Sequence, residues 1–583
     1  MRIKHFFGLA VIAAMTASCS SNNDLVNGGG NGSGENESGA SYASFSINLP
    51  TTSGTRADGD PEFVDGTANE YKVNDATLLI FKKGATEKEG DYTFVESAEL
   101  GSMSPWKDPN ETGVTTHAKI TAKLDKVNKT DKFFALVLLN NGTGDNAKVT
   151  LPTTEGNKFS DWNVAAKATY DKFTNTDNGF YMANAPLFDK DNTTNKVTTL
   201  VAIKKDNIYP TEEQAAKGTA TDIYVERGLA KVTLGTTTTT AEKTVADGAY
   251  QGDKVKITNW ALDVTNKKTF PIHNVDGLTT DYTDIWNNTA TPAGSNGATT
   301  QRFVDTNPNT KAKRVYWGKD PNYDKSDLLG TEEAGKTARE ENFNYIKNNT
   351  DVKVDPSKPL YCLENTFNLA NMMQGQTTRV IFKAIYTPKS LTEGEKTFYK
   401  IGKNTAIWKE ADLKQEIEAA VASVVSGAAG KTTVTLNADK NDITAAGTHY
   451  ITKDNITVTG VETITDENIK AINTQLGLKE TDKVGISTYA GGESYYIARI
   501  KHFGDDLTQW ESGLYGEKNL EYLGRYGVLR NNWYELTVQS VSGPGYPSVP
   551  DVKPNTPDDE DDKYISVSVK ILDWAKRSQS VEL

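Results

Sequence analysis

The sequence predicts a mainly β protein with short helical insertions, and three observations lead to this fold class. Short stretches rich in Val, Ile, Thr and Tyr recur along the chain between Asn, Asp and Gly breaks, as in the strands of β-sandwiches. Several of them alternate apolar and polar residues, which is the period of a half-buried strand. Regular helices do not separate consecutive strands, and this argues against a βαβ sheet.

The composition suits several packed domains and argues against some functions. The chain has 583 residues and a formal net charge of −13, with 77 Asp and Glu residues against 64 Lys and Arg residues. This length suggests about two to four domains, and the acidic balance argues against nucleic-acid binding, which needs a basic surface. Two Cys and five widely scattered His residues give no support to a disulfide framework or a metal cluster. No catalytic motif stands out, so we predict that the protein is not an enzyme and uses no cofactor.

The first residues have the pattern of an export signal. Arg2 and Lys4 precede an apolar stretch over residues 6–15, which is too short to span a bilayer. Small residues then lead to Cys19, and this arrangement resembles the lipid-attachment site of bacterial lipoproteins, although Thr16 stands where Leu is usual. We predict a lipoprotein signal peptide over residues 1–18 and a lipid on Cys19. The alternative is an ordinary signal peptide followed by a chance cysteine.

A linker and a single strand follow the signal. Residues 20–40 are rich in Gly, Ser and Asn, which predicts a flexible tether. A strand is then predicted from the alternating apolar residues Ala43, Phe45, Ile47 and Leu49, and Pro50 ends it. The polar stretch over residues 51–60 is predicted to be an exposed loop, where Arg56 would be open to a trypsin-like protease.

The body of the chain contains further predicted strands and two predicted helices. The strands cover residues 73–81, 133–139, 223–234, 255–264, 378–386, 495–500, 533–541 and 564–572. A helix over residues 411–425 places Leu413, Ile417 and Val421 on one face, and a weaker helix covers residues 467–476. We interpret both helices as insertions packed on the β framework. Cys362 lies in an apolar stretch, which favours a buried structural thiol over a nucleophile.

The C-terminus ends in an acidic connection, a strand and a short tail. Residues 558–562 are all acidic, and a solvated turn is the favoured interpretation over a calcium site, because the alternating spacing of a coordinating loop is missing. The tail from Trp574 regains alternation at Val581 and Leu583. It is either a frayed terminus or a strand that adds to the open sheet edge of another subunit.

Several short motifs, in a specific order, carry a family resemblance. They are FYMAN at 180–184, VERGLAKV at 225–232, YCLENT at 361–366, YGVLRNNWYEL at 526–536, GPG at 543–545 and ILDW at 571–574. With them the sequence resembles the fimbrillins of the Bacteroidota type V pilus, most closely the stalk subunit of the short (minor) fimbriae. The resemblance extends over nearly the whole chain, from Cys19 to the final strand.

This resemblance implies a fold and a processing site. The fold would be two tandem transthyretin-like β-sandwich domains, which we place at residues 57–220 and 221–583, the second with insertions and a C-terminal donor strand. Residues 19–56 would form a propeptide. An Arg-specific protease would cut after Arg56 and leave Ala57 as the mature N-terminus.

The family also implies how subunits join. The propeptide strand with Phe45, Ile47 and Leu49 would leave the N-terminal sandwich after cleavage. The C-terminal segment of a neighbouring subunit, Trp574–Leu583, would insert in its place with Val581 and Leu583 as anchors. Such head-to-tail contacts do not close and therefore give filaments.

The predicted function is that of a structural subunit of a surface fimbria that also mediates adhesion. Its expected partners are copies of itself, anchor and tip subunits, an Arg-specific protease, receptors on host or bacterial surfaces, and the outer membrane through the lipid of the precursor. One alternative is a tip or accessory adhesin of the same pilus. Another is a surface glycan-binding lipoprotein or hydrolase, in which Cys19 and Arg56 would remain covalently connected.

Overall fold

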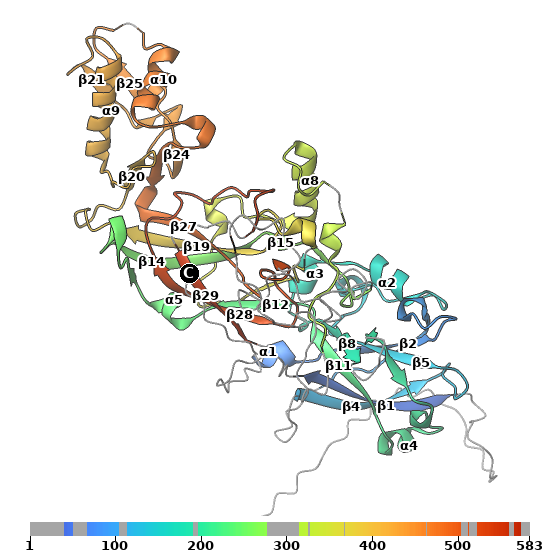
Figure 1. Ribbon diagram of the computed structural model, residues 1–583. Helices are drawn as coiled ribbons and strands as arrows, with labels where there is room; N and C mark the ends of the chain where they lie inside the picture. The colour runs from blue at the N-terminus through green and yellow to red at the C-terminus, as the bar shows by residue number, and fades with distance from the viewer. Residues whose placement is uncertain are drawn as a thin grey trace, which may run out of the picture.

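The computed structural model describes most of the chain in several segments. They are residues 40–50, 67–103, 114–189, 196–276, 314–324, 327–366, 368–461, 463–502, 511, 522–558 and 565–572. Figure 1 shows two β-rich parts that follow one another and a smaller module that projects from the second part. The predicted fold class, mainly β with short helical insertions in tandem sandwiches, is confirmed.

The N-terminal sandwich is formed by one curved sheet. Its strands run in the order β3-β2-β5-β7-β11-β1-β4, and β10 also pairs with β5. They are β1 (Ser41–Pro50), β2 (Ala76–Lys82), β3 (Thr93–Glu99), β4 (Val114–Leu124), β5 (Phe133–Leu139), β7 (Met182–Asn184), β10 (Val201–Ile203) and β11 (Thr221–Arg227). A single hydrophobic core contains apolar side chains from strands at both edges of this sheet, β3 and β4.

The two edges of this sheet approach each other. Glu96 on β3 accepts hydrogen bonds from the backbone N–H groups of Asp125 and Lys126, just after β4, at 3.0 Å each. Leu78 on β2 and Ile223 on β11 are both fully buried in the shared core. The sheet therefore folds over on itself, as alternating strands with one apolar face require.

The C-terminal sandwich consists of two four-stranded sheets. One has the order β18-β12-β28-β29 and the other β13-β14-β19-β27. The strands are β12 (Ala230–Leu234), β13 (Lys243–Thr244), β14 (Lys254–Asp263), β18 (Leu360–Cys362), β19 (Arg379–Thr387), β27 (Glu493–Arg499), β28 (Trp533–Val541) and β29 (Ile565–Leu572). Trp260, Phe382 and Leu536 are fully buried between these sheets.

The chain crosses from one sandwich to the other at Gly228. The single strand predicted over residues 223–234 is in fact two strands, β11 and β12, which belong to different sheets. A Cβ atom at Gly228 would lie 2.5 Å from the Phe173 ring, so only glycine fits at this crossing. The N-terminal sheet thus extends to Arg227, beyond the boundary at residue 220 that the sequence suggested.

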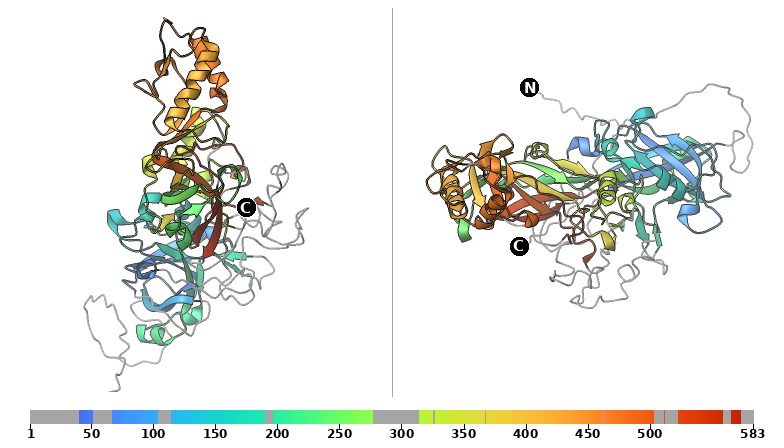
Figure 2. Two further views of the ribbon diagram at one scale, coloured as in Figure 1. Left: turned by 90° about the vertical axis from the view of Figure 1, so that its left-hand side faces the viewer. Right: turned by 90° about the horizontal axis from the view of Figure 1, so that it is seen from above.

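A separate module is inserted between β19 and β27. It contains α9 (Glu410–Val424) and α10 (Asp466–Gln475) with β20 (Phe398–Ile401), β21 (Thr432–Val434), β22 (Asn437–Ala438), β23 (Asn441–Asp442), β24 (Gly447–His449), β25 (Ile456–Val458) and β26 (Ile486–Tyr489). The module has its own hydrophobic core, which includes Leu413 and Ile417. Figure 2 shows it at one end of an elongated molecule. Both predicted helices exist, but they pack inside this module and not on the sandwiches.

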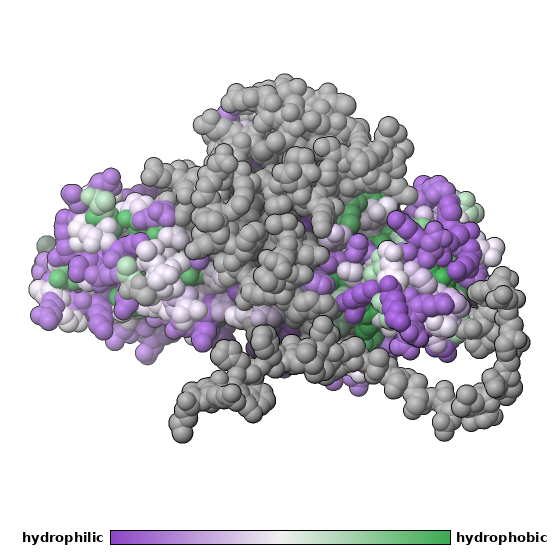
Figure 3. Space-filling model, turned by 90° about the horizontal axis from the view of Figure 1, so that it is seen from below, coloured by the Kyte–Doolittle hydropathy of each residue, from purple (hydrophilic) through white to green (hydrophobic). Residues whose placement is uncertain are grey.

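Shorter elements surround the junction of the sandwiches and their edges. They are α1 (Ala68–Tyr71), α2 (Phe159–Ala165), β6 (Ala168–Thr169), α3 (Tyr170–Thr174), β8 (Leu187–Asp189), β9 (Lys196–Thr198), α4 (Glu212–Lys217), α5 (Thr236–Thr240), β15 (Thr265–Asn266), β16 (Lys268–Thr269), α8 (Glu333–Asn342) and β17 (Phe343–Asn344). Figure 3 shows mainly hydrophilic residues on the described surface of one face, with apolar residues in smaller areas. Among the described residues, no helix is long and apolar enough to cross a membrane, and no cluster of three metal-binding side chains occurs.

Candidate functional site

Strand β1 is an inner strand of the N-terminal sheet and not an edge strand. It runs parallel to β11, with Phe45 opposite Thr221 and Ile47 opposite Ile223. On its other side it runs antiparallel to β4 over its whole length. We call the space that β1 occupies between β11 and β4 the β1 site. Without β1, both neighbours would each lose a row of backbone hydrogen bonds.

The core-facing side chains of β1 are the alternating set that the sequence predicted. Ala43 and Phe45 are completely buried, and Ile47 and Leu49 are each 4% exposed. All four belong to the N-terminal hydrophobic core. Burying each of the larger three contributes roughly 1.5–3 kcal/mol. The predicted residues Phe45, Ile47 and Leu49 therefore lie together in one site.

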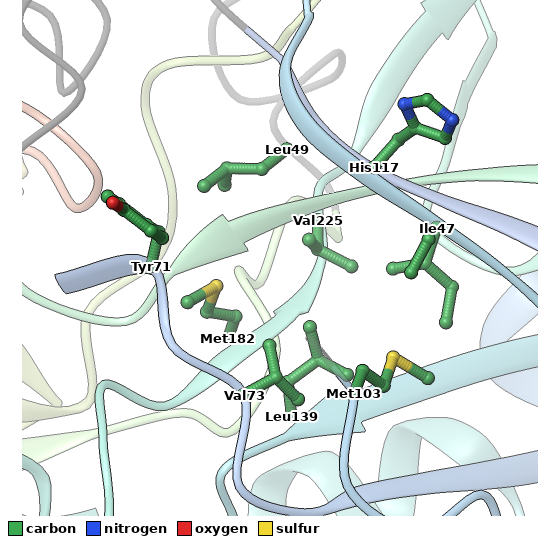
Figure 4. Close-up of a pocket in the computed structure, with 10 residues that line it drawn as sticks. Ile47, Leu49, Tyr71, Val73, Met103, His117, Leu139, Met182 and Val225 are labelled. Atoms are coloured by element: carbon green, nitrogen blue, oxygen red, sulfur yellow. The ribbon is translucent and has the colours of Figure 1, made fainter. Parts of the chain in front are cut away.

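The packing of β1 is incomplete at its Leu49 end. A cavity of about 20 Å³ lies there, close to the space of one water molecule. Ile47 and Leu49 reach it from β1, and Val73, Met103 and Met182 line it from the surrounding elements (Figure 4). Flexible Met side chains suit a site of irregular shape. This end of the β1 site is thus less tightly filled than the fully buried positions of Ala43 and Phe45.

The first strand of the C-terminal sandwich, β12, has the same kind of neighbours as β1. Strand β12 runs parallel to β28 on one side and antiparallel to β18 on the other. Each sandwich therefore inserts its first strand between one parallel and one antiparallel neighbour. The difference is in the connections, because β12 follows β11 directly through Gly228 and Leu229. Strand β12 is therefore covalently linked at both ends to folded elements, β11 and α5.

A buried charged network fixes the β11 wall of the β1 site. Glu226 on β11 accepts a hydrogen bond from Arg314 at 2.8 Å and lies 3.1 Å from Nδ1 of His273. Burial alone would raise the pKa of Glu226, but His273 and Arg314 outweigh it and hold this pKa at about 2. The carboxylate is therefore ionised at neutral pH, and it ties β11 to His273 and Arg314, which lie between β16 and α8 in the chain.

A second set of contacts ties the same region to the C-terminal sandwich. Lys231 on β12 pairs with Glu70 at 2.7 Å, and both side chains are almost fully buried. The Tyr361 hydroxyl donates to the same carboxylate at 2.7 Å. On β11, Arg227 donates to the side-chain oxygen of Asn531 at 3.2 Å. These bonds join the sandwiches through several buried polar groups, which favours a rigid junction.

The remaining predicted site residues are outside the described residues. These are Cys19, Arg56, Ala57, Trp574, Val581 and Leu583. Strand β29 ends at Leu572, shortly before the predicted tail, and pairs antiparallel with β28. Cys362 is fully buried, and burial raises the pKa of its thiol to about 12, as expected for a structural cysteine.

Sequence reasoning missed two polar residues of the site, Ser44 and Asn48. Both are on the outer face of β1, which the alternating pattern predicts to be in contact with water. Ser44 is nevertheless completely buried and Asn48 is 5% exposed. Asn48 donates to the backbone oxygens of Ser46 at 3.0 Å and Ile223 at 3.4 Å. A local pattern cannot reveal this burial, because distant parts of the chain provide the cover.

A protein-family model matches the C-terminal region of the chain. Residues 487–580 match the model described as major fimbrial subunit protein type IV, fimbrillin, C-terminal. This segment contains β27, β28 and β29. The C-terminal part of the chain is therefore fimbrillin-like, as the motifs had indicated. The matched family consists of fimbrial subunits and not enzymes, in agreement with the prediction that the chain is not an enzyme.

The chain is distantly similar to several solved structures. A protein from Parabacteroides distasonis described as a cell adhesion protein is 11% identical, with 92% of this chain and 98% of that chain covered and a TM-score of 0.39. The tip fimbrial protein Mfa3 from Porphyromonas gingivalis, with a C-terminal truncation, is 10% identical, with 91% and 100% covered and a TM-score of 0.27. These TM-scores are too low to support an argument about function. No curated protein sequence matches the chain.

Proposed function

We propose that the chain is a fimbrial subunit that polymerises by replacing β1 with the C-terminal segment of a neighbouring subunit. The observation that carries this proposal is the place of β1, a buried inner strand that precedes the rest of the fold in sequence. The fimbrillin match over residues 487–580 supports the class of protein. The precursor would be held in the outer membrane by a lipid on Cys19, and the mature subunit would belong to a fimbria on the cell surface.

Cleavage after Arg56 activates the subunit in this proposal. Before the cut, β1 is covalently attached to the chain and returns to its site after any local opening. After the cut only non-covalent contacts retain it, so its loss becomes a dissociation. The empty β1 site would expose an apolar core surface and two unpaired strands, which favours addition of another strand. Trp574–Leu583 of the next subunit would fill it, with Val581 and Leu583 directed into the core.

The partners follow from this route of assembly. An Arg-specific protease makes the cut, further copies of the chain extend the fibre, and anchor and tip subunits end it. Receptors on host or bacterial surfaces are the expected targets of adhesion. The inserted module over residues 398–489 projects from the molecule (Figure 1), and this favours a second candidate, a tip or accessory adhesin that uses the module for contact.

Arg56→Ala and Arg56→Lys test the activation step. Both should give a folded, lipidated precursor that does not polymerise, since an Arg-specific protease accepts neither residue. Thr55→Ala is the matched control and should polymerise. The measurement is N-terminal sequencing of surface-sheared material together with detergent-resistant ladders on gels. Fibres of normal length from either Arg56 variant would contradict the proposal, as would a wild-type chain that begins at acylated Cys19 and remains monomeric.

Labelling of wild-type fibres separates the two roles. Gold-labelled antibody against the chain should mark the whole length of each fibre if it is the stalk subunit. Label confined to one end would show a tip subunit instead.

Deletion of residues 574–583 tests the donor role of the tail. It should block polymerisation and leave the monomer soluble, and unchanged fibres from that variant would exclude the donor role.

A further inference from the structure

The outer face of β1 is covered by a short segment of the same domain. We call residues 209–218, which include α4, the α4 segment. Helix α4 packs across both β1 and β4, at the lower end of the N-terminal sandwich in Figure 1. Ala215 in this helix and Ser44 in β1 are both completely buried. At this point the β1 site is closed on its outer side as well as on its core side.

Ser44 is hydrogen-bonded on both sides beneath this cover. Its hydroxyl donates to the carbonyl oxygen of Ala215 at 2.7 Å. The Oγ1 atom of Thr121 on β4 lies 2.8 Å from the Oγ atom of Ser44. Since Ser44 uses its only proton toward Ala215, Thr121 is the donor in the second bond. A small hydroxyl side chain therefore fills this position, and a larger one would meet the α4 backbone.

The α4 segment is bonded to β4 as well as to β1, whose Tyr42 exchanges two backbone hydrogen bonds of 2.8 Å with Tyr209. Lys119 on β4 donates from Nζ to the carbonyl oxygens of Ala216 at 2.9 Å and Gly218 at 3.1 Å. The hydroxyl of Tyr209 accepts a hydrogen bond from the backbone N–H of Thr219 at 3.0 Å. The Lys119 bonds do not involve β1, so they would hold α4 over the β1 site when another strand enters. The backbone bonds that Tyr42 makes with Tyr209 would have to be formed by the incoming strand.

Ser46 lies on the same face of β1 as Ser44 and provides a comparison position outside the cover of α4. It is two residues from Ser44 and therefore points to the same side of the strand. Its side chain is only partly buried, and its hydroxyl oxygen lies 3.4 Å from the Nδ2 atom of Asn48 on the same strand. A larger side chain at position 46 has room toward solvent, whereas one at position 44 does not.

We propose that the α4 segment selects the strand that enters the β1 site by admitting only a small hydroxyl residue at the position of Ser44. This inference rests on the proposed replacement of β1, and the occupant it favours is the C-terminal tail of a second copy. If Val581 and Leu583 face the core, Ser578 and Ser580 fall on the outer face, because alternate residues share a face. The tail therefore carries the required residue type on the required side.

The selection also sets the register of the incoming strand. The apolar face alone accepts a shift by two residues, because every second residue remains core-facing after such a shift. A bulky residue such as Lys576 or Glu582 beneath the α4 segment would not fit. The position of Ser44 beneath the α4 segment must therefore be taken by Ser578 or Ser580. In both of these registers Val581 faces the core.

Peptide exchange into the full chain tests this inference. A specific protease site replaces residues 52–56 of the otherwise complete protein, which is cut and mixed with labelled peptides. The parent peptide has the sequence of residues 41–49. Fluorescence anisotropy measures its uptake and that of the Ser44→Leu and Ser46→Leu versions. We expect the Ser44→Leu peptide to bind at least about tenfold more weakly, because it overfills the site and removes the hydrogen bonds of the Ser44 hydroxyl to Ala215 and Thr121. The Ser46→Leu peptide should bind within about threefold of the parent.

The outcomes separate this inference from the proposed function. Failure of the parent peptide to enter the cut protein would count against replacement of β1 and would overturn the proposed function. Entry of the parent and Ser44→Leu peptides with equal affinity would overturn the α4 selection alone. In the full chain, Ser578→Leu with Ser580→Leu should abolish polymerisation, whereas Lys576→Leu with Glu582→Leu should retain it. Equal behaviour of the two pairs would also contradict the selection.

Discussion

Phe45 is the largest side chain that β1 contributes to the N-terminal core, and it is completely buried. Phe45→Ala should destabilise the precursor by about 3–5 kcal/mol, because it removes buried apolar surface and leaves a cavity. The midpoint of urea denaturation measures this loss. Ser46→Ala, on the adjacent, partly exposed position, is the control and should change the midpoint little. A small effect of Phe45→Ala would show that β1 contributes little to the stability of the precursor.

The ionised carboxylate of Glu226 makes the stability of the protein depend on pH. Its pKa is about 2 in the folded protein against a usual value of 4.5. The stabilisation by this group is therefore complete above about pH 4.5 and is lost as the pH falls toward 2. Glu226→Gln should show a smaller loss of urea midpoint between pH 5 and pH 3 than the wild type.

Glu213 provides a control for this pH dependence. It pairs with Lys217 on the surface, with a side chain that is 78% exposed. Glu213→Gln should therefore keep the wild-type dependence on pH. If Glu226→Gln and the wild type lose the same amount of stability over this range, the network around β11 is not the source of the acid sensitivity.

At the scale of elements, the inserted module and the sandwich beside it have separate cores. Phe398 and Tyr489 stack at the base of the module with ring centroids 4.4 Å apart. Both residues belong to the core of the sandwich, whereas Ile417 belongs to the core of the module. The base is therefore the point where one folding unit ends and the other begins.

Ile417→Ala should consequently loosen the module alone. Loss of this fully buried side chain costs about 2–5 kcal/mol. We expect faster hydrogen exchange over residues 399–488 and unchanged exchange in β14, β19 and β28, as measured by mass spectrometry. Val424→Ala, at a partly exposed position of the same helix, is the control. Faster exchange throughout the sandwich would show that the two cores unfold as one unit.

At the scale of the whole molecule, buried ion pairs join the two sandwiches. Lys231→Met leaves the Glu70 carboxylate buried without this cation, and breaking a buried pair in this way costs about 3–5 kcal/mol. The measurement is the free energy of unfolding, combined with X-ray scattering, which should show a wider range of angles between the sandwiches. Lys217→Met removes an exposed partner and should alter neither. Unchanged scattering from a destabilised Lys231→Met protein would mean that apolar packing alone orients the sandwiches.

Much of the local structure follows from the sequence alone. The alternating residues 43–49 determined which side chains of β1 enter the core, because the side-chain period of a strand is two. Helices α9 and α10 lie close to their predicted ranges, since their apolar spacing and end signals are local. The apolar stretch around Cys362 likewise predicted that its thiol is buried.

The neighbours of each element were decided only by the tertiary structure. Strand β1 pairs with residues 114–124 and 221–224, and no local pattern specifies such distant partners. The burial of Ser44 beneath α4 and the division of residues 223–234 between two sheets have the same origin. Periodicity reports which face of a strand is apolar, whereas packing against remote segments determines whether the polar face meets water or protein.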